Sequence, residues 1–220
     1  MRSTDIHNTD YKKRFNKMYE LGLDLTWFDK KVPKQIRTYI EYLVSTKQIN
    51  FQNSKLLEIG CGRGVFLSYL EKAGFKKTIG VDVSEVAIEF AKERVKTSQV
   101  QVEDVIKGLS FSSEEFDLVA EITVLSSLNP HLWPNILKEI SRVLKTNGHF
   151  ISEIFVREEN ESLYIPQKND SNISPELDQV YGVSRSELIK IISKYFKIEK
   201  CLPISPESGG SFFVLAKKLS

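Results

Sequence analysis

Short apolar runs alternate with segments of helical period through the middle of the chain, and this alternation limits the fold more than any other feature. The apolar runs have the length and composition of buried strands and cover residues 55–60, 77–83, 100–105, 116–122 and 149–155. Between them, the segments 65–74, 84–96 and 134–148 each carry the apolar period of a helix. Strands that alternate with helices form parallel sheets covered on both faces. We therefore expect an α/β fold, a three-layer sandwich whose mostly parallel sheet has helices on both faces.

The C-terminal part of the chain departs from this alternation. A helix is predicted at 184–196, followed by strands at 197–204 and 211–218 that are joined by residues 205–210. Because that connection contains no helix, the two strands should pair as an antiparallel hairpin at one edge of the sheet. The polar residues 157–182 show no sustained period, and we interpret them as an insertion in the domain.

Two helical patterns precede the first strand. In the first, Tyr11, Phe15 and Tyr19 recur at i, i+4 and i+8 and form one apolar face. We expect residues 1–50 to form an N-terminal helical segment that packs as a lid on a domain of residues 51–220.

Three glycines, Gly60, Gly62 and Gly64, lie within five positions between the first predicted strand and the helix that follows it. A glycine inside regular structure costs about 0.5 to 1 kcal/mol relative to alanine, so such a cluster indicates a tight turn or the close approach of another molecule. Asp82 ends the next strand, 82 minus 60 or 22 positions after the first of these glycines. A carboxylate at that point can accept hydrogen bonds from both hydroxyls of a ribose. The pattern predicts a nucleoside site at the carboxyl ends of parallel strands.

The glycine turn differs from the dinucleotide fingerprint G-x-G-x-x-G, because Val65 occupies the position of its third glycine. With Glu58 included, the stretch is E-x-G-x-G-x-G. Here the chain, from Leu56 to Leu219, resembles the Rossmann-like (class I) S-adenosylmethionine-dependent methyltransferases, which have a seven-stranded sheet. The resemblance implies that S-adenosylmethionine is the cofactor and S-adenosylhomocysteine the product, and that the C-terminal strand is antiparallel to an otherwise parallel sheet.

The resemblance also implies which residues of the glycine turn hold the cofactor. By position, Gly60, Cys61, Gly62 and Gly64 line its methionine part, and Glu58 supports its amino-acid end electrostatically. For Cys61 we expect a small residue in a crowded turn rather than a catalytic nucleophile.

Four further residues match the family's adenosine site. Asp82 matches the ribose-binding acid, and Val83 the residue beside the adenine, although a strand-core role is common at such a position. Asp104 matches the acid that accepts from the adenine amino group, with Val105 supplying a neighbouring amide. The alternatives are that Asp104 caps a turn, or that Glu103 is the working acid.

Glu121 and Ile122, at the end of the fourth predicted strand, match positions that face the sulfonium and the methyl acceptor in this family. A carboxylate there would attract an amine or take its proton, and we name it as the candidate catalytic residue. The alternative is a solvated strand end. A positively charged sulfonium makes the methyl group reactive without covalent catalysis by the protein, so proximity and alignment suffice and no catalytic dyad is required.

Trp27, with Phe28, follows the first helix and is expected to close over the cofactor. Ordinary helix packing explains the aromatic face of that helix nearly as well. We expect acceptor choice to depend on this N-terminal segment and on the insertion at 157–182.

Composition and charge narrow the partners. The chain holds 31 Lys and Arg against 29 Asp and Glu, a net charge of +2, which indicates neither a nucleic acid nor a membrane partner. No run reaches the ~18 apolar residues of a membrane span, and the N-terminal residues lack the apolar region of a secretory signal, so we expect a cytoplasmic protein. The two cysteines, Cys61 and Cys201, lie far apart, and the three histidines are scattered, so neither a disulfide nor a metal site is expected.

These observations together favour a methyltransferase that acts on a small-molecule substrate. A protein substrate, methylated on lysine or on an amino terminus, is the first alternative, because those enzymes share the same core. A catalytically silent S-adenosylmethionine-binding subunit is the second, and a Rossmann oxidoreductase is a more distant one. The sequence leaves open the acceptor atom and the oligomeric state.

Overall fold

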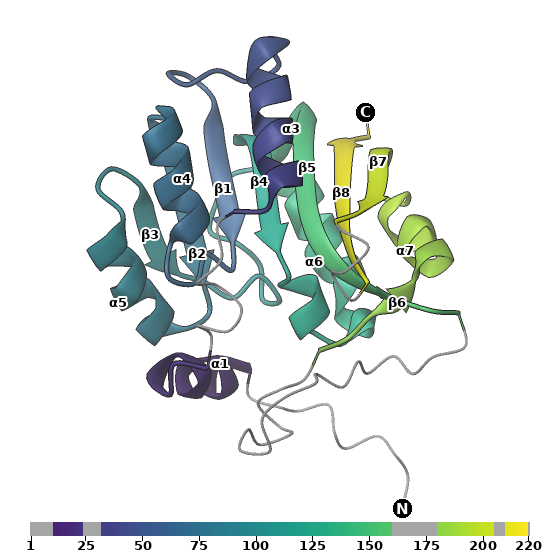
Figure 1. Cartoon of the computed structure of the whole chain (residues 1–220), viewed down its shortest axis with the longest axis horizontal. Helices are drawn as coiled ribbons and strands as arrows, with labels where there is room; N and C mark the ends of the chain where they lie inside the picture. Colours follow the sequence, from purple (N-terminus) through teal and green to yellow (C-terminus); the bar gives the residue numbers. More distant parts are fainter. Residues whose placement is uncertain (1–10, 24–31, 160–179, 205–209, 220) are drawn as a thin grey trace, which may run out of the picture.

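A computed structural model describes residues 11–23, 32–159, 180–204 and 210–219 (Figure 1). The described strands are β1 (Lys55–Ile59), β2 (Lys77–Asp82), β3 (Gln99–Val102), β4 (Phe116–Ile122), β5 (Leu144–Arg157), β6 (Val183–Ser184), β7 (Phe196–Pro203) and β8 (Ser211–Lys218). The described helices are α1 (Tyr11–Glu20), α3 (Lys34–Ser45), α4 (Val65–Ala73), α5 (Glu85–Arg94), α6 (Trp133–Val143) and α7 (Arg185–Ile192), with the 3-10 turns η1 (Leu125–Ser127) and η2 (Pro130–Leu132).

The strands form one mixed sheet in the order β3-β2-β1-β4-β5-β8-β7, and β6 pairs with β5 off this path. Strands β1 to β5 are parallel, β8 is antiparallel to β5, and β7 is antiparallel to β8. The expected mostly parallel sheet with an antiparallel C-terminal hairpin is therefore confirmed. The hairpin arises because the link between β7 and β8 has no helix that would return the chain to the same end of the sheet.

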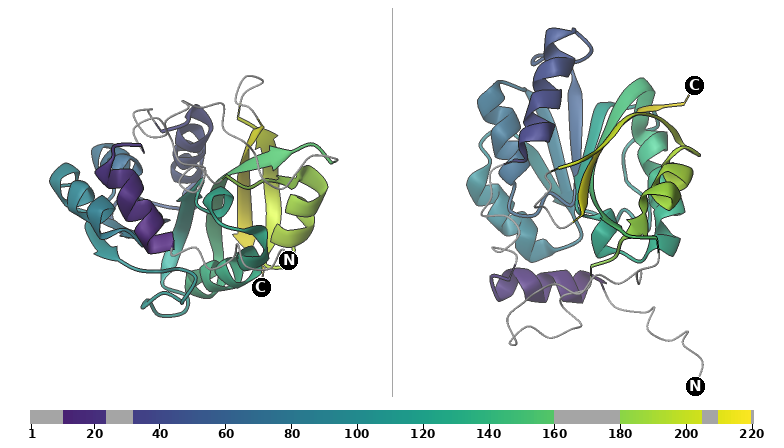
Figure 2. Two further views of the ribbon diagram at one scale, coloured as in Figure 1. Left: turned by 90° about the horizontal axis from the view of Figure 1, so that it is seen from below. Right: turned by 45° about the vertical axis from the view of Figure 1, so that its right-hand side comes forward.

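Helices cover both faces of the sheet (Figure 2). On one face, apolar residues of α3 and α4 pack on Leu118, Ile151 and Leu215, and α5 packs beside α4. On the other face, apolar residues of α6 and α7 pack on Val119, Phe150 and Val214. On each of β4, β5 and β8, the residue in the first core and the residue in the second core are consecutive in the sequence. The two-residue period of each strand therefore divides its side chains between the two cores.

Local signals explain where the helices begin and end. The hydroxyl of Ser84 accepts a hydrogen bond from the Ala87 amide, 3.1 Å away, and caps the start of α5. Ser184 and Glu187 form a reciprocal capping box at the start of α7. Gly74, with φ +108°, ends α4.

Helix α1 lies across the carboxyl ends of the central strands (Figures 1 and 2). The Arg14 guanidinium donates to the carbonyl oxygen of Ser127, 2.9 Å away, and the Lys12 ammonium lies 2.5 Å from the Glu85 carboxylate. The Ser84 hydroxyl also donates to the side-chain oxygen of Asn16, at 2.6 Å. These contacts join α1 to η1 and to the start of α5. The predicted helix is confirmed, and the boundary between an N-terminal segment 1–50 and a domain 51–220 stays a prediction.

Two predicted helix ends were wrong. The predicted helix 134–148 ends at Val143, because the next residue, Leu144, already pairs with Phe116 as the start of β5. Asn147 adopts φ +64°, a left-handed conformation that asparagine tolerates, and the β4–β5 register is irregular between Phe116 and Leu118. The predicted helix 184–196 ends at Ile192, since its last predicted residue begins β7.

The insertion predicted at 157–182 lies mostly outside the described residues. Its two flanks are described: Val156 of β5 pairs in parallel with Val183 of β6. Within the described part of the chain, no helix is both long and apolar enough to cross a membrane. The same part contains no group of three or more His, Cys, Asp or Glu side chains placed to hold a metal ion.

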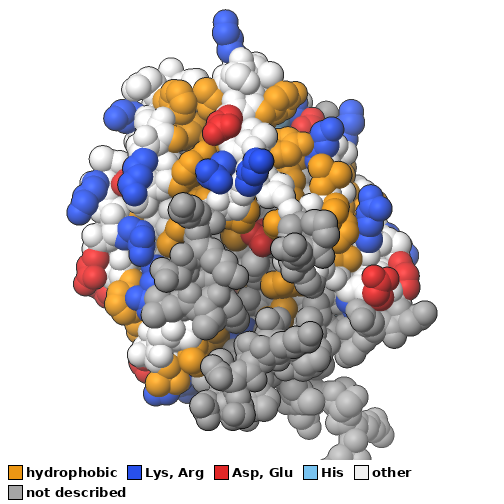
Figure 3. All heavy atoms as spheres, viewed as in Figure 1, with side chains coloured by type: hydrophobic (Ala, Val, Ile, Leu, Met, Phe, Trp, Pro, Cys, Tyr) orange, Lys and Arg blue, Asp and Glu red, His pale blue; other side chains and the backbone are white. Residues whose placement is uncertain are grey.

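The outer surface over α3 and α4 carries hydrophobic side chains among Lys and Arg (Figure 3). In this region Tyr42 is 49% exposed and Phe51 is 37% exposed. Scattered exposed apolar residues of this kind are common on globular proteins.

Candidate active site

The three glycines between β1 and α4 all adopt left-handed backbone angles, with φ +68° at Gly60, +49° at Gly62 and +72° at Gly64. L-residues with side chains rarely adopt such angles. A Cβ on Gly60 would lie 2.1 Å from the Cγ2 of Val124, and one on Gly62 would lie 2.7 Å from the hydroxyl oxygen of Tyr19. Both the backbone conformation and the closeness of its neighbours therefore require glycine in this turn.

Asp82 ends β2 directly beside this turn and is only 7% exposed. Its two carboxylate oxygens accept hydrogen bonds from the Gly62 amide and the Ser84 amide, each at 2.9 Å. Burial raises the pKa of Asp82 to about 6, although these amide donors oppose the shift. The carboxylate thus connects the glycine turn to the start of α5 and is mostly ionised at neutral pH.

Glu58 lies on β1 and is 4% exposed. One of its carboxylate oxygens, Oε2, is buried with no hydrogen-bond partner among the described residues. Burial, followed by the nearby charge of Asp82, raises the pKa of Glu58 well above its usual value. A buried acceptor without a donor is costly, which suits a site where a cationic ligand group supplies the missing partner.

Cys61, inside the glycine turn, is 4% exposed. Burial, with the charges of Asp82 and Glu58, raises the pKa of its thiol well above the usual value, so the thiol is protonated at neutral pH. A Cβ on Gly80 would lie 2.9 Å from the Cys61 sulfur, which shows how crowded this position is. The thiol therefore fills space in the turn, as expected from the sequence.

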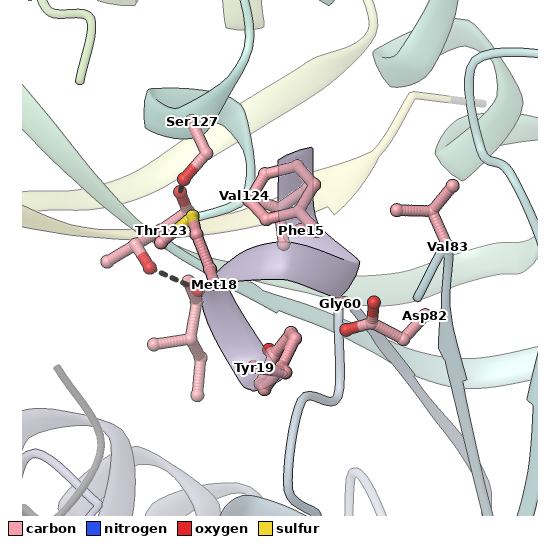
Figure 4. Close-up of a pocket in the computed structure, with 10 residues that line it drawn as sticks. Phe15, Met18, Tyr19, Gly60, Asp82, Val83, Thr123, Val124 and Ser127 are labelled. Carbon is pink, nitrogen blue, oxygen red and sulfur yellow. Dashed lines mark hydrogen bonds between the residues drawn. The ribbon is translucent and has the colours of Figure 1, made fainter. Parts of the chain in front are cut away.

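Two adjoining pockets open at the carboxyl ends of β1, β2 and β4. The Thr123 pocket is lined by Phe15, Met18, Tyr19, Gly60, Asp82, Val83, Ile122, Thr123, Val124 and Ser127 (Figure 4). The Asp104 pocket is lined by Tyr11, Phe15, Ile59, Gly60, Val81, Asp82, Val83, Glu103, Asp104, Val105, Ile106, Val124 and Leu128. The two pockets share Phe15, Gly60, Asp82, Val83 and Val124.

The structure therefore brings five of the residues predicted from the sequence to the walls of these pockets: Gly60, Asp82, Val83, Asp104 and Val105. The other members of the glycine turn, together with Glu58, are not among the lining residues of these two pockets.

Asp104 and Glu103 both line the Asp104 pocket, so the structure leaves both as candidates for the adenine-binding acid. Asp104 accepts from the Ile106 amide at 3.0 Å and pairs with Lys107 at 3.2 Å, so it also caps a turn. Glu103 accepts from the backbone amide and the hydroxyl of Ser110. The two expected roles of Asp104, turn cap and pocket wall, are compatible.

Glu121, the candidate catalytic residue, lies on β4 and is buried. It is 1% exposed, and it accepts from the Leu125 amide at 3.1 Å and from the Ser152 hydroxyl. Burial raises the pKa of Glu121 to about 7, although the hydrogen bonds from these donors oppose the shift. The alternation of β4 directs Glu121 to the α6 side, and the next residue, Ile122, reaches the Thr123 pocket instead. Glu121 is not among the lining residues of these two pockets, and its catalytic role stays a prediction.

Thr123 and Ser127 line the pocket and were missed from the sequence. Thr123 has φ +64°, which is unusual for a β-branched residue and costs roughly 1 to 3 kcal/mol. Four hydrogen bonds hold it. Its amide donates to the Glu153 carbonyl at 2.9 Å, and its hydroxyl donates to the Ile122 carbonyl at 2.7 Å. Its carbonyl accepts from the Ser127 amide at 3.1 Å and from the Ser127 hydroxyl at 3.0 Å. The only sequence signal was a hydroxyl-rich stretch, 123–127, directly after an apolar strand.

Helix α1 forms the outer wall of both pockets. Phe15, Met18 and Tyr19 project from α1 at the Thr123 pocket (Figure 4), and Tyr11 lines the Asp104 pocket. Trp27, the residue that the sequence assigned to the lid, lies outside the described residues. Closure of a lid over the cofactor stays a prediction.

Comparison with known proteins relates this arrangement to a family. Residues 57–152 match the family described as "Methyltransferase domain". Phthiotriol/phenolphthiotriol dimycocerosates methyltransferase of Mycobacterium leprae is 32% identical over 110 residues, which are 49% of this chain and 40% of that protein. EEF1A lysine methyltransferase 2 of Danio rerio is 27% identical over 153 residues, which are 64% of this chain and 63% of that protein.

Solved structures show the same architecture. The 1,6-didemethyltoxoflavin-N1-methyltransferase of Burkholderia thailandensis, with bound 1,6-didemethyltoxoflavin and S-adenosylhomocysteine, superposes with a TM-score of 0.72 at 18% identity. The superposition covers 96% of this chain and 88% of that one. At this identity the likeness is one of fold. The chain spans less than two thirds of the length of either relative named above.

Proposed function

We propose, from the premise that the chain belongs to the class I family of S-adenosylmethionine-dependent methyltransferases, that it transfers the methyl group of S-adenosylmethionine to a small-molecule acceptor and releases S-adenosylhomocysteine. One observation carries the proposal: Gly60 of the left-handed glycine turn and Asp82, at the carboxyl ends of the neighbouring strands β1 and β2, both line two adjoining pockets.

The residues of the site fit this cofactor. The carboxylate of Asp82 would accept from the ribose hydroxyls, and Gly60, beside it in the wall of both pockets, would let the cofactor approach the backbone closely. The unpartnered oxygen of Glu58 would attract the ammonium of the methionine part. Asp104 or Glu103 would accept from the adenine amino group.

When bound, S-adenosylmethionine supplies an electrophilic methyl group on a positively charged sulfur. The chain's own contribution is to orient the two reactants and to exclude water, which is sufficient to lower the barrier by several kcal/mol. Apolar side chains line much of the Thr123 pocket, among them Phe15 and Met18 of α1 and Val124 after β4, and they would exclude water once the ligands are bound.

A small acceptor is favoured because α1 crosses the strand ends and forms one wall of the pocket, so an acceptor must fit beneath it. A protein amine is the second candidate, supported by the similarity to a lysine methyltransferase. Incubation with S-adenosylmethionine labelled in the methyl group separates the two. Label in the small-molecule fraction of a cell extract supports the first candidate, and label in its protein fraction supports the second.

Binding of the cofactor is tested by titration calorimetry with S-adenosylmethionine, S-adenosylhomocysteine and a nicotinamide dinucleotide. We expect the first two to bind and the third not to bind. Asp82→Ala should weaken the binding of S-adenosylmethionine at least tenfold, about 1.4 kcal/mol, because two hydrogen bonds from the ribose are lost. Wild-type affinity in this variant would contradict the assignment of Asp82.

A further inference from the structure

Thr123 and Ser127 line the Thr123 pocket, and neither of their hydroxyls has a hydrogen left to donate into it. Each hydroxyl has one hydrogen to donate and two lone pairs that accept. The Thr123 hydroxyl donates its hydrogen to the Ile122 carbonyl at 2.7 Å, and the Ser127 hydroxyl donates its hydrogen to the Thr123 carbonyl at 3.0 Å (Figure 4). Since both hydrogens are engaged with the backbone, a ligand that meets these oxygens must bring the donors.

The apolar wall of the pocket strengthens the requirement that the ligand brings hydrogen-bond donors. Most of the pocket wall near these hydroxyls is apolar, with Phe15, Ile122 and Val124 among the lining residues. A donor group that leaves water for such a wall loses stability unless it finds an acceptor there. An acceptor-only group, such as a carboxylate, would face the lone pairs of both hydroxyls and is disfavoured.

The two hydroxyls are also held in place rather than free to turn. Thr123 has φ +64°, and its amide donates to the Glu153 carbonyl at 2.9 Å. Ser127 is 7% exposed, and its amide donates to the carbonyls of Thr123 and Val124. Reorienting either hydroxyl to donate into the pocket would break an existing hydrogen bond to the backbone.

We propose that Thr123 and Ser127 form an acceptor-only face that selects a small molecule with a primary amine, neutral when bound, as the methyl acceptor. The proposal rests on the proposed function and names its substrate class. Two N–H groups of the amine donate to the two hydroxyl oxygens, which leaves the nitrogen lone pair for the methyl carbon. That lone pair forms the new C–N bond as the C–S bond breaks. The sulfur keeps its electron pair as the thioether of S-adenosylhomocysteine, and the methylated nitrogen releases a proton to water.

Sinefungin tests this face without knowledge of the natural acceptor. In this analogue a carbon that bears an amine replaces the methylated sulfur, so its N–H groups occupy the region of the transferred methyl. S-adenosylhomocysteine has only a thioether there and serves as the reference ligand. We expect the wild-type protein to bind sinefungin more tightly than S-adenosylhomocysteine in titration calorimetry.

Thr123→Val and Ser127→Ala should each reduce the affinity for sinefungin at least tenfold, about 1.4 kcal/mol, and leave the affinity for S-adenosylhomocysteine within about twofold. Thr123→Ser keeps the hydroxyl and should restore the preference for sinefungin. The matched controls are Thr46→Val and Ser45→Ala, whose hydroxyls also donate to a backbone carbonyl, that of Tyr42, but at the end of α3. The controls should bind both ligands like the wild type.

Three results would overturn the inference. The first is a wild-type protein that binds S-adenosylhomocysteine more tightly than sinefungin, and the second is a preference for sinefungin that persists in Thr123→Val and Ser127→Ala. The third is an equal loss of affinity for both ligands in these variants, with no recovery of affinity in Thr123→Ser. If the wild type binds neither ligand, the proposed function itself fails. The source of the amine is settled in a second arm with methyl-labelled S-adenosylmethionine. Labelled N-methylamine in the small-molecule fraction supports the proposal, whereas label only on protein lysines or on oxygen or sulfur contradicts it.

Discussion

Replacing Glu121 with glutamine should stabilise the protein at alkaline pH and leave its stability almost unchanged at acid pH. Glu121 is 1% exposed, and burial raises its pKa from 4.5 to about 7. The pKa of this carboxyl group is higher in the folded protein than in the unfolded chain. Its contribution to stability is fully present below the pKa of the unfolded chain, and it is lost as the pH rises through the pKa of the folded protein. Glutamine has no proton to lose, so its contribution does not change with pH.

The size of the effect follows from the shift. The difference between 7 and 4.5 is 2.5 pH units, and at 1.36 kcal/mol per unit the wild type should lose about 3 kcal/mol relative to Glu121→Gln between pH 4.5 and pH 8.5. The glutamine amide preserves the local contacts, because its oxygen can accept from the Leu125 amide and its nitrogen can donate to the Ser152 hydroxyl. Other titrating groups occur in both proteins and cancel in the difference.

The measurement is the free energy of unfolding in urea at pH 5, 6, 7, 8 and 8.5, followed by tryptophan fluorescence. Glu89→Gln is the control: Glu89 is on the surface of α5, its side chain is 71% exposed, and the substitution should change the unfolding free energy by less than about 0.5 kcal/mol at every pH. A difference between wild type and Glu121→Gln that is constant from pH 5 to pH 8.5 would refute the reasoning. Such a result would mean that Glu121 is solvated and free to ionise.

Three further predictions follow from the same structure. Gly62→Val should abolish S-adenosylmethionine binding in calorimetry, because a side chain at φ +49° would meet the Tyr19 hydroxyl, 2.7 Å from the new Cβ; normal affinity would make the turn purely structural. Because the pKa of Asp82 is about 6, the affinity for S-adenosylmethionine should fall as the pH drops below 6, and a pH-independent affinity between 5 and 8 would argue against a carboxylate acceptor. Burial and the charge of Lys217 lower the pKa of His149 from 6.5 to about 4, so the wild type should lose about 3 kcal/mol of stability relative to His149→Gln as the pH falls from 6.5 to 4, and parallel urea denaturation curves would contradict this.

Local signals predicted much of the fold. The apolar runs of the strands, the apolar period of the helices and the three glycines are properties of a few consecutive residues, and each appeared in the structure at or near its expected place. The antiparallel hairpin was predictable because a short connection without a helix has few alternatives. The two helix ends that were wrong, at Val143 and Ile192, depend on strand pairing with distant residues, which no local pattern reports.

In the candidate site too, some residues were predictable from local sequence and others were not. Gly60 and Asp82 were predictable because a turn and a strand end are local, and parallel strands bring their carboxyl ends to one edge of the sheet. Asp104 and Glu103 could not be separated, since both line the pocket and both accept from their own loop. Ile122 lines the Thr123 pocket whereas Glu121 does not, because consecutive residues of a strand point to opposite faces of the sheet.

By itself, then, the sequence determined the order of strands and helices, the glycine turn and the acid that faces it, because these depend on backbone conformation and on contacts between near neighbours. Only the tertiary structure decided which face of β4 carries Glu121, how Thr123 is held at a positive φ, and that α1 lies across the strand ends. Each of these depends on partners more than 20 residues away, namely Ser152 for Glu121, Glu153 for Thr123 and Ser127 for Arg14. Contacts of that kind form only when the whole sheet has assembled, because the sheet brings distant residues together and buries them from water.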